Sequence, residues 1–253
     1  MIWLWLCYAL LCVLDAAGGQ RIVGGQETSI RQVPYLVYLR QGGKFICGGS
    51  LLSPSCVLSA AHCVYGAEAK DYTVHAGASR LEAAAPVVRN VAQFHIAPSY
   101  DPGNFDMDVA ILQLSSRIHL SAGQVTTIAP CRTAPGSNAY VRISGWGVRN
   151  EESREPAAQV RTTLVRVVPQ RECQQAYAGQ AQISDSMLCA AVRGIRDSCS
   201  GDSGGPLVYR GEVCGIVSWG FGCARAAYPG VYTNVASNRV RNFVDQTLRK
   251  LRS

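Results

Sequence analysis

The segment 197–206 reads Asp197-Ser198-Cys199-Ser200-Gly201-Asp202-Ser203-Gly204-Gly205-Pro206 and places Ser203 among glycines and aspartates. A serine hydroxyl is a poor nucleophile at neutral pH, so acyl transfer needs an adjacent base and backbone N–H groups that stabilise an oxyanion. The glycines permit a tight turn in which the N–H groups of Gly201 and Ser203 point into one concavity. Taken alone, the segment is also compatible with a surface turn rich in Gly and Ser. Whether it carries a catalytic serine depends on a base and an acid elsewhere in the sequence.

A candidate base ends the short apolar segment Leu58-Ser59-Ala60-Ala61-His62-Cys63. We take His62 as that base and interpret the other histidines as ordinary core or surface residues: His75, His95 and His119. A candidate acid stands where Asp106-Met107-Asp108 leads into the apolar run 109–114. A carboxylate there is costly without a partner, and one that accepts a hydrogen bond from the histidine ring stabilises the imidazolium. We prefer Asp108 to Asp106, which lies further from the apolar run.

In the order His62, Asp108, Ser203, these segments resemble the chymotrypsin-fold serine endopeptidases, and more closely their trypsin-like branch. The order itself separates the chain from α/β-hydrolases and subtilisin-like enzymes. The likeness extends from Ile22 to about Val244 and includes Cys47-Gly48-Gly49-Ser50-Leu51, Ile143-Ser144-Gly145-Trp146-Gly147, Gly215-Ile216-Val217-Ser218-Trp219-Gly220 and Pro229-Gly230-Val231-Tyr232. The resemblance implies that Ser203 attacks the peptide carbonyl, His62 moves the proton, Asp108 orients the ring, and the N–H groups of Gly201 and Ser203 form the oxyanion hole.

Length and composition fit a β-rich protein: 253 residues, 48% hydrophobic, with 25 glycines. Runs typical of strands recur between turn signals, at 33–40, 44–52, 72–76, 91–96, 109–114, 139–144, 164–168, 206–209, 212–218 and 230–235. The resemblance implies an all-β fold of two six-stranded antiparallel barrels, about 22–125 and about 126–253, linked near Ser121–Thr133. It places His62 and Asp108 on the first barrel, Ser203 on the second, and the site between them.

The C-terminus has a different pattern. Val240, Phe243, Val244 and Leu248 recur at helical spacing, with Arg and Lys at other positions. This pattern predicts a C-terminal α-helix, which we expect to pack on the second barrel.

The N-terminus indicates secretion and processing. An apolar run over residues 1–14 is too short to span a membrane comfortably, and small residues follow it, which predicts a signal peptide over 1–19 cleaved within Ala16–Gly19. The sequence Arg21-Ile22-Val23-Gly24-Gly25 resembles the family's activation site, so residues 20–21 are the expected propeptide. The resemblance implies that cleavage after Arg21 frees an ammonium on Ile22, which pairs with buried Asp202 and orders the Gly201–Ser203 turn.

Specificity follows from Asp197, which stands six residues before Ser203 where trypsin-like members carry the acid of the primary pocket. The resemblance implies cleavage after Arg or Lys, because a basic side chain that reaches a desolvated carboxylate forms a charge-assisted pair. Small residues keep such a pocket open. The expected substrate-binding set is Asp197, Ser198, Ser218, Trp219, Gly220, Gly222 and Gly230.

The cysteine count separates firm pairings from open ones. Eleven cysteines less Cys7 and Cys12 of the signal peptide leave nine, so one stays unpaired. The resemblance implies the bridges Cys47–Cys63, Cys173–Cys189 and Cys199–Cys223. For the rest we hypothesise a Cys131–Cys214 bridge, with Cys56 buried and free.

No cofactor or metal is expected, because the loop after Gly77 lacks the acidic pair that binds calcium in the trypsins this chain resembles, and the cysteine spacings match no ligand pattern. The expected partners are polypeptide substrates and an activating trypsin-like protease, with protein inhibitors left open. We expect a secreted, extracellular monomer with no nucleic-acid partner and no stable membrane association. The net charge of +7 keeps polyanion binding as an alternative.

Two other functions stay in view. A protease homologue without activity, acting as a binding or adaptor protein, usually lacks one of the three catalytic residues, and all three are present here. An active enzyme with relaxed or chymotrypsin-like preference is opposed by Asp197.

Overall fold

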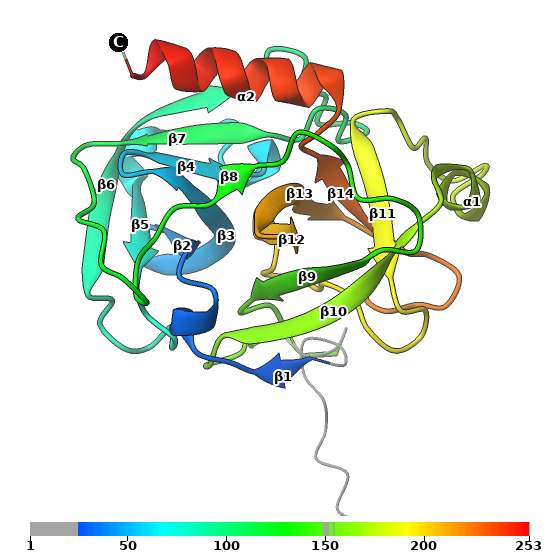
Figure 1. The fold of residues 1–253 in the computed structure, drawn as a ribbon, viewed down its shortest axis with the longest axis horizontal. Helices are drawn as coiled ribbons and strands as arrows, with labels where there is room; N and C mark the ends of the chain where they lie inside the picture. Colours follow the sequence, from blue (N-terminus) through cyan, green and yellow to red (C-terminus); the bar gives the residue numbers. More distant parts are fainter. Residues whose placement is uncertain (1–24, 149–151, 154, 253) are drawn as a thin grey trace, which may run out of the picture.

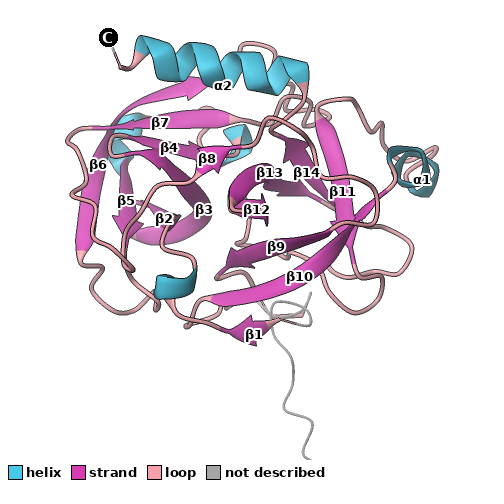
Figure 2. Cartoon of the chain, in the orientation of Figure 1, coloured by secondary structure: helices cyan, strands magenta, loops and turns pink. Residues whose placement is uncertain are grey.

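The computed structural model describes residues 25–148, 152–153 and 155–252. The expected signal peptide (1–19), the propeptide and the activation residues Arg21 and Ile22 lie outside the described residues. Strands dominate the rest, and they form two barrels side by side with a long helix lying across one end (Figures 1 and 2).

The first barrel is closed in the order β2-β3-β4-β7-β6-β5, with every neighbouring pair antiparallel. Its strands are β2 (Leu36–Gln41), β3 (Lys44–Ser53), β4 (Cys56–Ser59), β5 (Tyr72–Ala76), β6 (Val87–Ile96) and β7 (Ala110–Leu114). Closure leaves no free strand edge, and inward-facing apolar side chains fill the interior.

The second barrel runs β10-β11-β14-β13-β12-β9 and is closed by pairing between β9 and β10. Its strands are β9 (Tyr140–Gly145), β10 (Arg161–Val168), β11 (Met187–Ala191), β12 (Pro206–Tyr209), β13 (Glu212–Trp219) and β14 (Gly230–Asn234). Two short strands extend this sheet: β1 (Gln26–Glu27) pairs with β10, and β8 (Ala129–Pro130) pairs in parallel with β13. The predicted fold of two six-stranded antiparallel barrels is therefore confirmed.

Two barrel strands, β4 and β11, were not predicted from the sequence, and neither were the two-residue strands β1 and β8. All residues of β4 and β11 are buried, so neither strand shows the alternation of apolar and polar residues that is typical of a strand with one solvent-exposed face. A short helix was also missed: α1 (Gln170–Ala176) is mostly polar and buries Cys173, which anchors it by a disulfide.

The predicted C-terminal helix is α2 (Asn238–Lys250), which buries Val240, Val244 and Leu248. The expectation that it packs on the second barrel was only partly right, because these side chains join an apolar cluster made mostly of first-barrel residues together with Val213 and Ile216 of β13. Figure 1 shows α2 above β7 and reaching the end of β14. The helix therefore covers the seam between the barrels. Within the described residues, no helix is long and apolar enough to cross a membrane.

The described part of the chain contains four disulfides, which include the three expected bridges Cys47–Cys63, Cys173–Cys189 and Cys199–Cys223. The fourth joins Cys131, just after β8, to Cys214 of β13, as hypothesised. Both of its cysteines are fully buried, and Cys131 N donates a 3.0 Å hydrogen bond to Val213 O. The bridge therefore fastens the segment between the barrels to the second barrel. Cys56 is free and buried in β4.

This pairing predicts a single reactive thiol. Alkylation of the unfolded, unreduced mature chain should label Cys56 alone, and replacing Cys131 and Cys214 together by alanine should lower the free energy of unfolding by about 2–4 kcal/mol. Peptide mapping and denaturant titration measure the two effects. Labelling of Cys131 or Cys214 in the wild-type chain would contradict the assignment.

Candidate active site

His62 lies on a single turn of 3₁₀-helix, Ala61–Cys63, which directly follows β4. Ala60 and Ala61 before it are fully buried, so the chain enters the turn against the barrel core. The ring Nδ1 is 2.8 Å from Asp108 Oδ2, and the backbone N–H of His62 donates to Asp108 Oδ1 over 2.9 Å. The carboxylate thus holds both the ring and the main chain of His62 and favours a proton on Nδ1, the nitrogen that faces it.

Asp108 is fully buried, and its remaining partners come from the second barrel. Ser218 Oγ of β13 donates to Asp108 Oδ2 over 2.5 Å, and Thr233 Oγ1 of β14 donates to the Asp108 carbonyl over 2.7 Å. Sequence reasoning assigned Ser218 to the substrate pocket and missed its contact with Asp108. It missed Thr233 altogether, since nothing in the sequence pairs a threonine of β14 with an aspartate of the other barrel.

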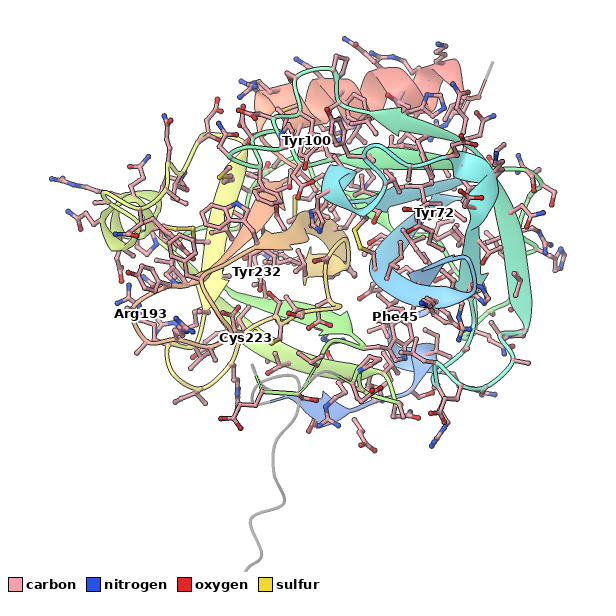
Figure 3. All side chains as sticks on the ribbon, turned by 180° about the vertical axis from the view of Figure 1, so that it is seen from behind. Phe45, Tyr72, Tyr100, Arg193, Cys223 and Tyr232 are labelled. Carbon is pink, nitrogen blue, oxygen red and sulfur yellow. A yellow bond between two sulfur atoms is a disulfide. The ribbon has the colours of Figure 1, made fainter. Side chains whose placement is uncertain are left out.

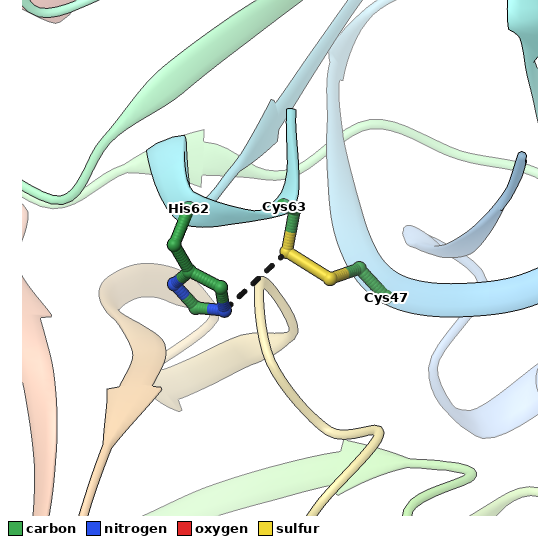
Figure 4. A group of neighbouring side chains, drawn as sticks. All are labelled: Cys47, His62 and Cys63. Atoms are coloured by element: carbon green, nitrogen blue, oxygen red, sulfur yellow. Dashed lines mark hydrogen bonds between the residues drawn. A yellow bond between two sulfur atoms is a disulfide. The ribbon is translucent and has the colours of Figure 1, made fainter. Parts of the chain in front are cut away.

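His62 Nε2 points toward the Cys47–Cys63 disulfide, 3.7 Å from Cys63 Sγ (Figure 4). Possible ligand atoms of these three residues lie within 4.8 Å of one another, but both sulfurs are bonded to each other and offer no thiolate to a metal. In the described structure no hydrogen bond joins Nε2 to Ser203 Oγ. Such bonds are often loose in ligand-free enzymes and shorten when substrate binds.

The Ser203 turn is fixed from both barrels. Gly48 N of β3 donates to Ser203 O over 2.8 Å, and Val148 N donates to Ser200 O over 2.7 Å. Gly201 has a φ of +91°, and a Cβ there would lie 3.3 Å from Gly147 Cα and from the Phe45 ring, so only glycine fits without strain. Within the described residues, the N–H groups of Gly201 and Ser203 donate to no protein acceptor. Both are available to an oxygen of a ligand.

A cavity of about 240 Å³ opens beside Ser203. All seven predicted pocket residues line it: Asp197, Ser198, Ser218, Trp219, Gly220, Gly222 and Gly230. The Cys199–Cys223 bridge joins two of its walls. In Figure 3, Cys223 and Tyr232 lie on the second-barrel half, and Phe45 and Tyr72 lie on the first.

Among the described residues that line the cavity, Asp197 is the only acid, and it is 2% exposed. Burial raises the pKa of its carboxyl to about 7, although hydrogen bonds from Ala224 N (3.2 Å) and Ser198 N (2.8 Å) oppose the shift. No basic side chain of the described residues pairs with it. The cavity therefore contains a buried acid that no cation of the described residues pairs with.

Asp202, next to Ser203, is also a buried acid. It is 3% exposed, and its two oxygens accept from Gly147 N (2.8 Å) and Cys199 N (3.1 Å). Burial raises its pKa to about 6, against the effect of these two donors. A Cβ on Gly145 or Gly147 would overlap this carboxylate, which explains the glycines on either side of Trp146.

An aromatic wall near His62 was not predicted. The Phe105 ring is 5.7 Å from the His62 ring, edge to face, and 6.4 Å from Trp219. Trp219 in turn contacts Tyr177 and Phe221. These rings come from both barrels, and their separation in sequence gave no sign that they meet.

A fold of two β-barrels with an Asp–His pair, a serine on a glycine turn and an acid pocket defines the class of chymotrypsin-like serine proteases. The comparisons with known proteins agree. The family model described as Trypsin matches residues 22–244. Seminase of Drosophila melanogaster is 40% identical over 243 residues, covering 95% of this chain and 86% of Seminase.

Trypsin alpha of Drosophila erecta is 39% identical over 217 residues, covering 85% of this chain and 84% of that protein. The solved structure of mouse neuropsin, a serine protease, superimposes with a TM-score of 0.81 at 32% identity, covering 88% of this chain and 98% of the neuropsin chain. The chain belongs to the trypsin family. It is a serine endopeptidase that acts on polypeptides.

The pocket geometry predicts that Gly230→Ala displaces Asp197. The added Cβ would overlap Asp197 Oδ1, so the affinity for benzamidinium, a small planar cation, should fall at least about tenfold. Calorimetric titration measures the affinity. Gly136→Ala is the matched control, because its Cβ meets nothing within 4 Å. Equal affinities in the two variants would show that the carboxylate is not held against Gly230.

Proposed function

We propose that this chain is the secreted zymogen of an endopeptidase that cleaves after Arg or Lys. The observation that carries the proposal is Asp197, which is buried in the cavity beside Ser203 and has no cationic partner among the residues that the structure describes. A bound Arg or Lys side chain restores the solvation that the carboxylate loses on burial, and one charged hydrogen bond of this kind contributes about 1.5–3 kcal/mol. A neutral or acidic side chain leaves the carboxylate unpaired.

In the proposed mechanism Ser203 is the nucleophile and His62 is the general base. Ser203 Oγ attacks the carbonyl carbon after the basic residue while His62 Nε2 takes the Oγ proton, and the imidazolium is stabilised by Asp108. His62 then returns the proton to the leaving amine. In the second step water attacks the acyl-enzyme while His62 takes its proton, and His62 passes that proton to Ser203 Oγ as the acid product leaves. Charge on the former carbonyl oxygen is stabilised by the free N–H groups of Gly201 and Ser203, each donor contributing about 10²–10³ in rate.

Activation is proposed to need cleavage after Arg21. The new ammonium of Ile22 is the proposed partner of Asp202, whose carboxylate is buried and has only N–H donors among the described residues. Pairing favours the charged carboxylate and so stabilises the turn that carries Gly201 and Ser203. The four disulfides support folding in an oxidising, extracellular compartment.

The function is tested by hydrolysis before and after activation. The secreted precursor should be nearly inactive, and cleavage at Arg21 should produce hydrolysis of amide substrates that end in Arg or Lys but not in Phe or Ala. Arg21→Gln should block activation, and Ser203→Ala should remove activity from the cleaved protein. Folded, cleaved wild-type protein that hydrolyses none of the four substrates would support the inactive homologue instead.

Binding of cations should depend on pH through Asp197. Burial raises the pKa of this acid to about 7, and a cation binds only its ionised form, so binding below pH 7 requires loss of a proton. The dissociation constant of benzamidinium should therefore rise by about tenfold for each pH unit below 7. Titrations of the active enzyme from pH 5 to 8 measure it. Asp197→Asn should bind weakly at every pH, and a flat profile in the wild type would exclude Asp197 as the cation's partner.

A further inference from the structure

The backbone just before Asp108 has an unfavourable conformation. Phe105 has a φ of +59° and Met107 a φ of +55°, in the left-handed region that residues other than glycine rarely adopt. Asp106 lies between them. The turn is partly held by its own backbone, with hydrogen bonds from Phe105 N to Asp101 O (2.8 Å) and from Val109 N to Met107 O (2.7 Å). Such strain persists only where the surroundings hold it.

The side chain of Asp106 connects the turn to elements outside it. Its Oδ1 accepts hydrogen bonds from Ser186 Oγ (2.6 Å) and Ser184 Oγ (2.7 Å), just before β11 of the second barrel. Its Oδ2 pairs over 2.8 Å with a guanidinium nitrogen of Arg239, in the first turn of α2. Ser186 Oγ also accepts the backbone N–H of Met107 over 3.1 Å. One carboxylate therefore binds the strained turn to the second barrel and to the C-terminal helix.

The anchor on the second barrel is rigid. Ser186 is fully buried, and its carbonyl accepts the N–H of Asn234 at the end of β14 over 2.7 Å. The preceding residue of β14, Thr233, holds the Asp108 carbonyl. The chain is thus fastened to one region of the second barrel on both sides of Met107.

What this arrangement holds in place is the centre of the proposed site. Asp108 follows Met107 directly and makes both contacts with His62. Phe105 precedes Asp106 and puts its ring against the His62 ring. A shift of the turn would move the carboxylate and the aromatic wall together.

We propose that Asp106 is a positioning residue of the peptidase, which with Ser184, Ser186 and Arg239 holds the 105–107 turn so that Asp108 and Phe105 meet His62 in the productive geometry. The inference rests on the proposed function of His62 and Asp108. It assigns Asp106, set aside in favour of Asp108 on sequence grounds, to support of the same site. Asp106 contacts no substrate in this role.

The charges around Asp106 keep it ionised. Burial alone would raise its pKa, but hydrogen bonds from Ser186, Ser184 and Arg239 together lower it below the ordinary value. Arg239 also contacts Asp185, whose side chain is 75% exposed. Asp185 therefore shares the arginine with Asp106 and provides a control that leaves the turn untouched.

The test compares Asp106→Ala with Asp185→Asn in the cleaved, full-length enzyme. Asp106→Ala should lower kcat on an Arg amide substrate by about 10–100-fold, because a displacement of about 1 Å in a catalytic group costs that much. KM and the benzamidinium constant should stay within about twofold, since Asp197 is untouched. Because a misaligned Asp108 stabilises the imidazolium less, the acid limb of kcat/KM should move to lower pH. Asp185→Asn should match the wild type.

Two further variants separate positioning from folding. Asp106→Asn keeps an oxygen that accepts both serine hydroxyls, so it should recover much of the lost kcat. Ser186→Ala removes the hydrogen bond to Met107 N with a smaller change in volume. If Asp106→Ala does not fold, Ser186→Ala takes its place in the test and should show the same fall in kcat and the same change in the pH profile. A fall in melting temperature with kcat and the pH profile unchanged would overturn the proposal and leave Asp106 as a structural contact.

A readout without turnover separates this proposal from the proposed function. The low-field proton resonance of the His62 Nδ1–H···Asp108 hydrogen bond is observable in Ser203→Ala, where no hydrolysis occurs. In that background Asp106→Ala should shift or broaden the resonance, and Asp185→Asn should leave it unchanged. An unchanged resonance in Asp106→Ala would refute positioning even if the enzyme is active. If the cleaved wild-type enzyme is inactive but Asp106→Ala still shifts the resonance in the Ser203→Ala background, the proposed function is refuted and the positioning role of Asp106 stands.

Discussion

The buried carboxylate of Asp108 is the interaction on which the two halves of this molecule depend. It has no exposed surface, and removing a carboxylate from water costs several kcal/mol unless donors replace the water. Here the donors come from His62 of the first barrel and Ser218 of the second. Because each barrel supplies part of this hydrogen bonding, the carboxylate links the two barrels at the same point where it holds the histidine ring.

The strands set up this contact by where they end. β4 leads into the turn that carries His62, β7 starts two residues after Asp108, and β13 brings Ser218 to the end of the pocket that Trp219 also lines. The helix α2 then covers the seam, with its apolar side chains in the first-barrel cluster and Arg239 on Asp106. The rigid parts of the fold are barrels, and the chemistry lies in the loops between them.

Much of this arrangement was predictable from the sequence, and the failures have physical causes. Local chemistry of the motifs pointed to His62, Asp108 and Ser203, whereas Asp197 and the two barrels were predicted from the resemblance to the family. Alternating strands were found, but β4 and β11 were missed because burial on both faces removes the alternation. The packing of α2 and the contacts of Thr233 and Ser186 were missed because they join segments more than 70 residues apart.

The four acids near the site fall into two groups that differ in where their positive partner lies. The carboxylates of Asp108 and Asp106 both accept hydrogen bonds from donors that the folded chain itself supplies, and for Asp106 these donors lower the pKa below its ordinary value. Asp197 and Asp202 have backbone and hydroxyl donors but no cation among the described residues, and burial raises the pKa of each carboxyl to about 7 and about 6.

For a folded-state pKa raised above the ordinary value of 3.8, the charged form opposes folding, and the loss of stability grows as pH rises through the range between the two values. A cation that reaches either carboxylate removes that loss, so the free energy of burial becomes free energy of binding. Under the proposed function the two cations are a substrate side chain at Asp197 and the new N-terminus at Asp202. A buried carboxylate that lacks a cation would then account both for the preference for basic substrates and for activation by cleavage. The acids with partners inside the fold, Asp108 and Asp106, would keep the catalytic geometry constant.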